Sequence, residues 1–160
     1  MKSWVNERRL GLLAAGLGLL LGGCRAVGSE PAWTTDLDAA RERAAAENRA
    51  ILVNFSGSDW CGWCIRLDRE VFRQEAFQTF AAESLVLVLI DFPRGIPLPE
   101  DLAERNQDLA RRYGVQGFPT ILLMRADGTV VARTGYRRGG AAAYVRHLDA
   151  LLEGDGEDQP

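Results

Sequence analysis

Histidine and cysteine are scarce in this chain, which has one histidine, His147, and three cysteines, Cys24, Cys61 and Cys64. A structural zinc site usually takes four ligands, from two cysteine pairs or from one pair and two histidines. The chain offers one cysteine pair, so we expect no metal. His147 falls on the polar side of a predicted C-terminal helix, where we expect it to be solvated.

An excess of basic charge is also missing. Lys and Arg together number 19 against 22 Asp and Glu, which gives a formal net charge of −3 with both signs interspersed. A nucleic-acid-binding surface normally needs a concentrated positive charge. We therefore expect no nucleic-acid partner.

The chain begins with a basic segment and a short apolar run. Lys2, Arg8 and Arg9 precede residues 10–21, which are apolar over about a dozen positions. A helix that crosses a bilayer needs roughly 20 apolar residues, whereas an export signal needs fewer. The N-terminus therefore predicts export from the cytoplasm, with an uncleaved anchor as the alternative.

The apolar run ends in the letters LGGC, which resemble the bacterial lipobox. In that motif, small residues precede a cysteine that is lipidated and becomes the new N-terminus. The resemblance implies a lipoprotein signal peptide over residues 1–23 and a lipid on Cys24 that holds the protein at the periplasmic face of a membrane. Arg25 in place of an aspartate favours the outer membrane. An ordinary signal peptide followed by an incidental cysteine is the alternative.

The rest of the chain is long enough for one domain with its own core. Residues 24–32 are mostly small or polar and predict a tether, and residues 33–153 carry the periodic patterns of a folded domain. Residues 154–160 are acidic and contain glycine, which predicts a disordered tail. We expect the domain to be a monomer.

Hydrophobic periodicity predicts alternating strands and helices. The predicted helices cover residues 36–48, 61–69, 74–82, 99–114 and 139–154. The predicted strands cover residues 51–56 and 85–92, and a hairpin with an Asp-Gly turn covers 120–136. Thr35 and Asp38 are candidates for capping the first helix. The fold class is therefore α/β, with a central mixed β-sheet flanked by helices.

The first two predicted strands are joined by a helical crossover and should run parallel. Their carboxyl ends then share one edge of the sheet, where ligands usually bind in such folds. The letters SDWCGWC, residues 58–64, directly follow the first strand. If the strand that begins at Thr120 runs antiparallel, the letters GFPT return to the same edge. Two distant segments are thus expected to form one site.

Cys61 and Cys64 are separated by two residues at the start of a predicted helix. Residues three apart share a helix face, so the two sulfur atoms can reach disulfide distance. Free N–H groups of the first turn would stabilise a thiolate on an exposed Cys61, while Cys64 would be better shielded. This arrangement suits thiol–disulfide exchange. A permanent structural disulfide is the alternative, although so short a loop would stabilise only weakly.

The letters WCGWC after a strand, and YGVQGFPT before a hairpin and a helix, resemble the thioredoxin family over about residues 33–152. The resemblance implies a thioredoxin fold and a protein-disulfide oxidoreductase. It implies that Cys61 attacks a substrate, that Cys64 resolves the mixed disulfide, and that Pro119 is cis and faces the disulfide. It also implies that the backbone at Phe118 pairs with the substrate.

The tryptophans and the glycine of the motif have expected roles beside the sulfur atoms. Trp60 would flank the attacking sulfur as an apolar wall for a client peptide, or simply pack in the core. Gly62 and Trp63 bring no histidine between the cysteines, unlike strongly oxidising motifs, which favours reduction or repair of client disulfides. The expected partners are client proteins with disulfides or thiols, and a membrane or periplasmic electron donor.

No cofactor is expected beyond the redox-active disulfide Cys61–Cys64. A thioredoxin-like binding or chaperone module whose disulfide is only structural is the alternative function.

Two features depart from the family pattern. Asn54 stands where thioredoxins usually carry a buried acid, and an amide cannot take the proton from Cys64. Asp59 or Asp68 is a candidate to replace that acid. Residues 93–102 are an additional segment that begins at the predicted active edge, and it either lines the site or forms a surface loop.

Overall fold

A computed structural model describes residues 32–154 of the chain. The predicted signal peptide, residues 1–23, and Cys24 lie outside the described residues. Of the predicted tether 24–32 only residue 32 is described, and of the predicted tail 154–160 only residue 154. Within the described range, no helix is long and apolar enough to cross a membrane.

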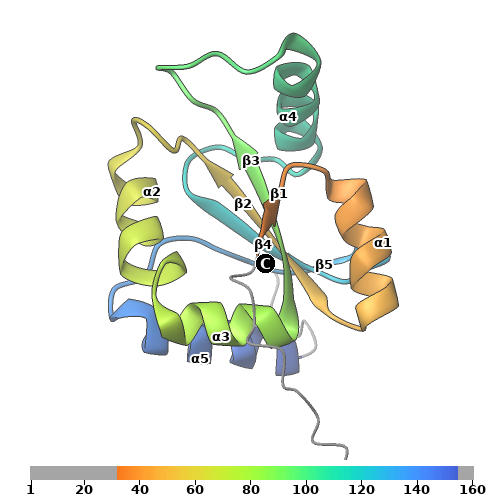
Figure 1. Ribbon diagram of the computed structural model, residues 1–160, viewed down its shortest axis with the longest axis vertical. Helices are drawn as coiled ribbons and strands as arrows, with labels where there is room; N and C mark the ends of the chain where they lie inside the picture. The colour runs from red at the N-terminus through yellow and green to blue at the C-terminus, as the bar shows by residue number, and fades with distance from the viewer. Residues whose placement is uncertain (1–31, 155–160) are drawn as a thin grey trace, which may run out of the picture.

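The domain is built on a five-stranded mixed sheet with the spatial order β1-β3-β2-β4-β5 (Figure 1). Its strands are β1 (Trp33–Thr34), β2 (Ala50–Ser56), β3 (Leu85–Asp91), β4 (Thr120–Met124) and β5 (Val130–Thr134). Strands β1, β2 and β3 are parallel, and β4 runs antiparallel to both β2 and β5. This confirms the predicted mixed sheet, including the hairpin, whose turn contains Gly128 at a φ of 93°.

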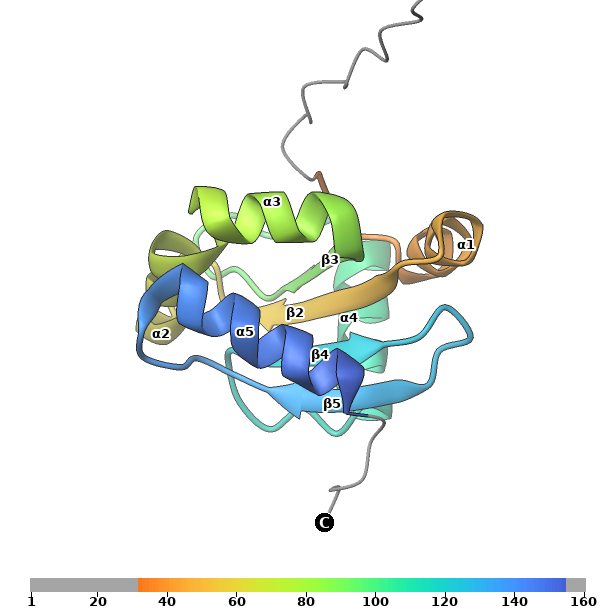
Figure 2. The ribbon, with the colours of Figure 1, turned by 90° about the horizontal axis from the view of Figure 1, so that it is seen from below.

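Helices cover both faces of the sheet (Figure 2). They are α1 (Leu37–Glu47), α2 (Gly62–Leu67), α3 (Glu75–Ser84), α4 (Glu100–Arg112) and α5 (Gly140–Glu153), with a π-helical turn η1 (Asp68–Phe72) directly after α2. Helices α3 and α5 lie on one face of the sheet, and α1 and α4 lie on the other (Figures 1 and 2). The sheet is therefore the middle of three layers.

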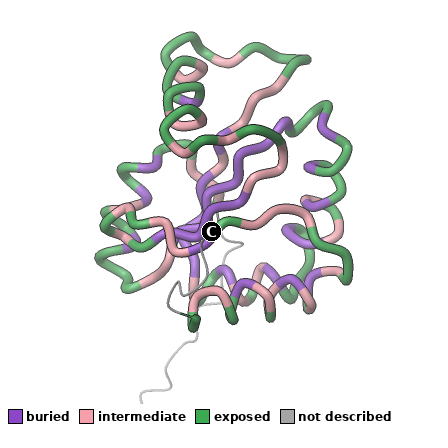
Figure 3. The backbone as a smooth tube through the Cα atoms, turned by 180° about the vertical axis from the view of Figure 1, so that it is seen from behind, coloured by how far each residue is buried: buried purple, intermediate pink, exposed green. Residues whose placement is uncertain are grey.

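Strands β2 and β3 are nearly continuous apolar runs, as expected of strands that are covered on both faces. Strand β2 is hydrogen-bonded to β3 on one side and to β4 on the other. Its side chains alternate between two cores: Leu52 packs with α3 and α5, while Val53 and Phe55 pack on the side of α1. The buried backbone in Figure 3 is concentrated in these strands, and the outer helix faces are exposed.

Three local features differ from the sequence prediction. Helix α1 is capped by Asp36, whose Oδ1 accepts hydrogen bonds at 3.0 Å from the N–H groups of Asp38 and Ala39, and not by Thr35. The helix expected over 61–69 begins at Gly62 and becomes the π-helical turn η1. Strand β1 was not predicted, since two residues are too few to show a period.

Candidate active site

Three chain segments meet at one edge of the sheet. Strands β2 and β3 end in register there, with Ser56 paired to Asp91, and β4 begins there with Thr120 paired to Phe55. The predicted convergence of the two motifs at the carboxyl ends of the parallel strands is thus confirmed.

The two cysteines of the motif form a disulfide at this edge, with their Cα atoms 5.2 Å apart. Cys61 is the N-cap of α2, and its Sγ accepts a hydrogen bond of 3.3 Å from the N–H of Cys64. The N–H groups of Trp60 and Cys61 both donate to the carbonyl oxygen of Gly57. The turn after β2 is therefore closed by its own backbone, and it presents Cys61 at the start of the helix.

The segment before β4 lies against the disulfide. The peptide bond between Phe118 and Pro119 is cis, as the family resemblance implies, and Sγ of Cys61 lies 3.6 Å from the carbonyl oxygen of Phe118. Cys61 is 7% exposed and Cys64 is 4% exposed. Cys61 is thus less exposed than expected, because the segment of Phe118 lies against its sulfur atom.

Trp60 stands at the surface beside the disulfide and not in the core, since 37% of it is exposed. Its indole N–H donates to the carbonyl oxygen of Phe92 at 2.8 Å. Its ring meets that of Phe118 edge-on at 6.0 Å, and Phe118 stacks on Phe92 at 5.0 Å. A Cβ on Gly57 would lie 2.5 Å from the indole, so only glycine fits there. Trp60, Phe118 and Phe92 thus form one aromatic cluster beside the disulfide.

The additional segment 93–102 contacts the site at its start, whereas its tip is exposed. The carboxylate of Asp59 accepts hydrogen bonds from the N–H groups of Arg94, at 3.0 and 3.1 Å, and of Gly95, at 2.5 Å. The guanidinium carbon of Arg94 lies 3.6 Å from the centre of the Trp60 ring. The start of this segment is therefore attached to the two residues that precede Cys61.

A second link joins the same two segments, and no sequence pattern indicated it. Oδ1 of Asp91 accepts from the N–H of Ser58 at 2.9 Å, and Oδ2 accepts from its hydroxyl at 2.5 Å. Nδ2 of Asn106, on α4, donates to the carbonyl oxygen of Asp91 at 2.9 Å. The position of Asp91 at the carboxyl end of a parallel strand is the one signal that could have suggested its role.

The chain is similar to known proteins. A family model described as a thioredoxin-like domain matches residues 37–150. The chain belongs to the thioredoxin-like family. The disulfide bond reductase DsbH of Chlamydia pneumoniae is 37% identical over 114 residues, which are 71% of this chain and 69% of that protein. The thioredoxin-related protein DsbJ of the same organism is 24% identical over 127 residues, but the chain spans only 36% of its length.

Solved structures agree with this assignment. A structure described as DsbH oxidoreductase superposes with a TM-score of 0.74 at 34% identity, over 83% of this chain and 92% of that one. A thioredoxin from Thermus thermophilus has a TM-score of 0.58 at 20% identity, over 81% of this chain and 92% of that one, and supports the fold alone. With its CxxC disulfide, this thioredoxin-like protein is a thiol–disulfide oxidoreductase.

Trp63, the second tryptophan of the motif, lies against a charged cluster. Its ring lies 5.1 Å from that of Tyr136, whose hydroxyl donates to Glu70 at 2.8 Å. Nε of Arg66 donates to the same carboxylate at 2.8 Å. The Tyr136 hydroxyl and Arg66 lower the pKa of Glu70, and Glu70 in turn raises the pKa of Tyr136. The positive charge beside Trp63 is thus paired with a carboxylate.

The amide oxygen of Asn54, the residue for which the resemblance to thioredoxins implies a buried acid, is buried without a partner among the described residues. Asn54 is 6% exposed, and its Oδ1 has no hydrogen-bond partner among residues 32–154. Neither candidate replacement is free to act as a base. Backbone N–H groups of Arg94 and Gly95 lower the pKa of Asp59, and Asp68 accepts from Nε of Arg73 at 2.6 Å.

His147 was expected to be solvated, and this is wrong. It is half-buried, its Nε2 lies 2.9 Å from the Thr134 hydroxyl, and its ring meets that of Tyr144 edge-on at 6.0 Å. Burial lowers the pKa of His147, and the charge of Arg137 lowers it further. The last helix turns this residue toward β5, which its spacing alone did not indicate.

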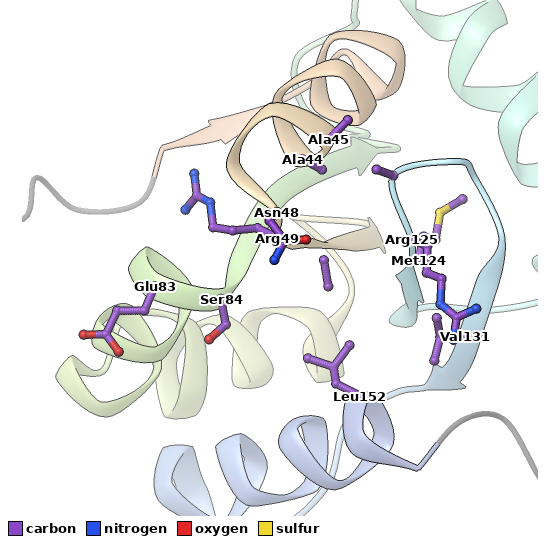
Figure 4. A pocket seen from close by; sticks show the side chains of 12 residues that line it. Ala44, Ala45, Asn48, Arg49, Glu83, Ser84, Met124, Arg125, Val131 and Leu152 are labelled. Atoms are coloured by element: carbon purple, nitrogen blue, oxygen red, sulfur yellow. The ribbon is translucent and has the colours of Figure 1, made fainter.

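An open concave region of about 480 Å³ lies beside the disulfide, lined by Gly62, Trp63 and Arg66 among others, and a second one lies far from it. A pocket of about 550 Å³ at the opposite end of β2 contains Arg49, whose Nη1 donates to the carbonyl oxygens of Ala82 and Leu85 at 3.0 Å (Figure 4). Among the described residues, no group of three or more His, Cys, Asp or Glu side chains could hold a metal ion.

The link between Asp59 and the additional segment should depend on pH. Because the folded-state pKa of Asp59 is lowered, its ionised form stabilises the fold above the ordinary value of 3.8, and this contribution is lost as the pH falls through the folded-state pKa. We expect the NMR amide shifts of Arg94 and Gly95 to titrate together with a midpoint below 3.8.

The variant Asp59→Ala should remove this transition and speed hydrogen exchange at both amides. A midpoint at or above 3.8 in the wild type, or unchanged exchange in the variant, would contradict the assignment.

Proposed function

We propose that this protein exchanges disulfides with client proteins through Cys61 and Cys64, in the reducing direction, at the periplasmic face of a bacterial membrane. The observation that carries the proposal is the position of Cys61. Its sulfur atom lies at the N-cap of α2, 3.6 Å from the carbonyl oxygen that precedes the cis-proline. A client strand paired with the backbone at Phe118 would bring its own sulfur atom to Cys61.

The reaction needs two exchange steps. The thiolate of reduced Cys61 attacks one sulfur of the client disulfide, so that the client S–S bond breaks, a mixed disulfide forms and one client thiolate leaves. The thiolate of Cys64 then attacks Sγ of Cys61 and releases the second client thiolate. Two electrons pass to the client, the Cys61–Cys64 disulfide forms, and a periplasmic or membrane donor of electrons restores the dithiol.

The surrounding residues support unequal roles for the two cysteines. The N–H of Cys64 donates to Sγ of Cys61 at 3.3 Å, a contact that would favour a thiolate on Cys61. Trp60 and Phe118 flank Cys61 with apolar surface for the client. The alternative, a binding module with a structural disulfide, has one observation in its favour, which is the low exposure of both cysteines.

Trapping of mixed disulfides separates these two functions. Cys64→Ser should accumulate mixed disulfides with clients, because the attacking thiol remains and the resolving thiol is gone. Cys61→Ser should accumulate few. The measurement is non-reducing electrophoresis of the tagged full chain after rapid acid quenching. Equal trapping by both variants would reject the assigned roles, and no trapping by either would favour the binding module.

The reducing direction is supported by the dipeptide between the cysteines, Gly62-Trp63, and by the similarity to DsbH, a disulfide bond reductase. We expect the couple to have a reduction potential near that of thioredoxin, about −270 mV, and well below that of the oxidant DsbA, about −120 mV. Equilibration of the exported domain with glutathione buffers measures it. A potential more positive than about −180 mV, the value of protein disulfide isomerase, would overturn the direction.

Membrane attachment is supported by the LGGC letters and the basic, apolar N-terminus. We propose that residues 1–23 are removed, that Cys24 carries lipid, and that residues 24–32 tether the domain at the outer membrane. Cys24→Ala, or globomycin treatment of cells, should leave a larger precursor on electrophoresis. An unchanged mobility together with a free thiol at Cys24 would exclude the anchor, and Cys61→Ala serves as a matched cysteine control.

A further inference from the structure

We infer that Arg94 is a specificity-determining residue that favours client segments with an aspartate or glutamate beside the reacting cysteine, on the side that passes over Trp60. The inference rests on the proposed function, because it names the clients that the same disulfide would reduce.

Two sets of hydrogen bonds hold the backbone at and near Arg94. Its backbone N–H, with that of Gly95, is bound by the carboxylate of Asp59. The carbonyl oxygen of Phe92, two residues earlier, accepts from the indole N–H of Trp60 at 2.8 Å. Arg94 is therefore positioned by the turn that carries Cys61, although more than thirty residues of chain separate the two.

The side chain of Arg94 is held in a way that leaves its hydrogen-bond donors available. Its guanidinium carbon lies 3.6 Å from the centre of the Trp60 ring, which is contact with the ring face. A guanidinium is planar and presents its N–H groups in a fork that matches a carboxylate. Arg94 is exposed, and a client approaching over Trp60 can reach these donors.

Arg94 also lacks a carboxylate partner of its own. Among residues 32–154 no ion pair is formed with its guanidinium, and Asp59 already accepts the two backbone N–H groups, although the charge of Arg94 contributes to the lowered pKa of Asp59. The N–H donors of the Arg94 guanidinium are therefore available to a client.

The second tryptophan of the motif, Trp63, differs in this respect. Arg66 lies 5.7 Å from the centre of the Trp63 ring, but its Nε is 2.8 Å from the carboxylate of Glu70. An arginine thus lies over each tryptophan of the motif. Of these two arginines, only Arg94 forms no ion pair with a carboxylate among the described residues. The preference for acidic residues should therefore be one-sided with respect to the client cysteine.

Short disulfide peptides test the inference. A neutral peptide with glutamine on both sides of the reacting cysteine is compared with peptides that carry glutamate or lysine on the N-terminal or the C-terminal side. The second-order rate of oxidation of the reduced exported domain, residues 25–160, is followed by stopped-flow tryptophan fluorescence at low salt and at about 1 M salt, where the Debye length is about 3 Å.

We expect glutamate on one side to raise the rate about two- to fivefold over glutamine, the range that an exposed ion pair of about 0.4–1 kcal/mol produces. Lysine on that side should lower the rate, and high salt should bring the ratio toward one. Arg94→Gln should abolish the ratio, and Arg94→Lys should restore part of it. Arg105→Gln, which removes an exposed arginine of α4 paired with Asp101, is the matched control and should keep the wild-type ratio.

The outcomes separate the inference from the proposed function. If the wild type reduces all peptides equally, or if Arg94→Gln keeps the wild-type ratio, the specificity role of Arg94 is wrong and the oxidoreductase function stands. If the reduced wild type fails to react with any peptide, including the neutral one, the proposed function itself fails. Equal acceleration by glutamate on both sides would overturn the one-sided preference.

Discussion

The parallel pairing of β2 with β3 is the constraint on which the rest of the site depends. The two strands remain in register from Ala50 and Leu85 to Ser56 and Asp91, so the chain leaves both at the same level of the sheet. The segments that follow then run side by side and are joined by successive polar contacts: Ser58 with Asp91, Trp60 with Phe92, and Asp59 with Arg94. A shift of one residue in this register would turn the buried side chains of β2 to the wrong faces and would misplace these contacts.

The sequence predicted the parts of the molecule that depend on local pattern. Apolar runs predicted the strands, and the CxxC spacing after a strand predicted the disulfide, because each of these patterns involves residues close together in the chain. The partners of Trp60 and the stacking of Arg94 could not be predicted, since they join segments that only the completed sheet brings together. The exposure of Cys61 was misjudged for the same reason: the segment at Phe118 arrives from more than fifty residues away.

Asn54 shows how the same strand serves both folding and chemistry. Strand β2 is covered on both faces, so an ionised side chain at this position would have to be buried beside Leu52 in a largely apolar core. An amide avoids burying a charge, but it cannot accept a proton. The described residues nearest in sequence that could replace it, Asp59 and Asp68, are both engaged in hydrogen bonds. Strand β2 therefore offers no carboxylate that could accept the proton from Cys64.

The additional segment after β3 is anchored at its start by Asp59, and Asn106 of α4 holds the end of β3 from behind. The tip lies beyond both anchors, and Ile96 there is 79% exposed. The two anchors thus separate the length of the tip from the geometry of the disulfide, so the tip is the part of the segment where a longer or shorter chain would cost the fold least.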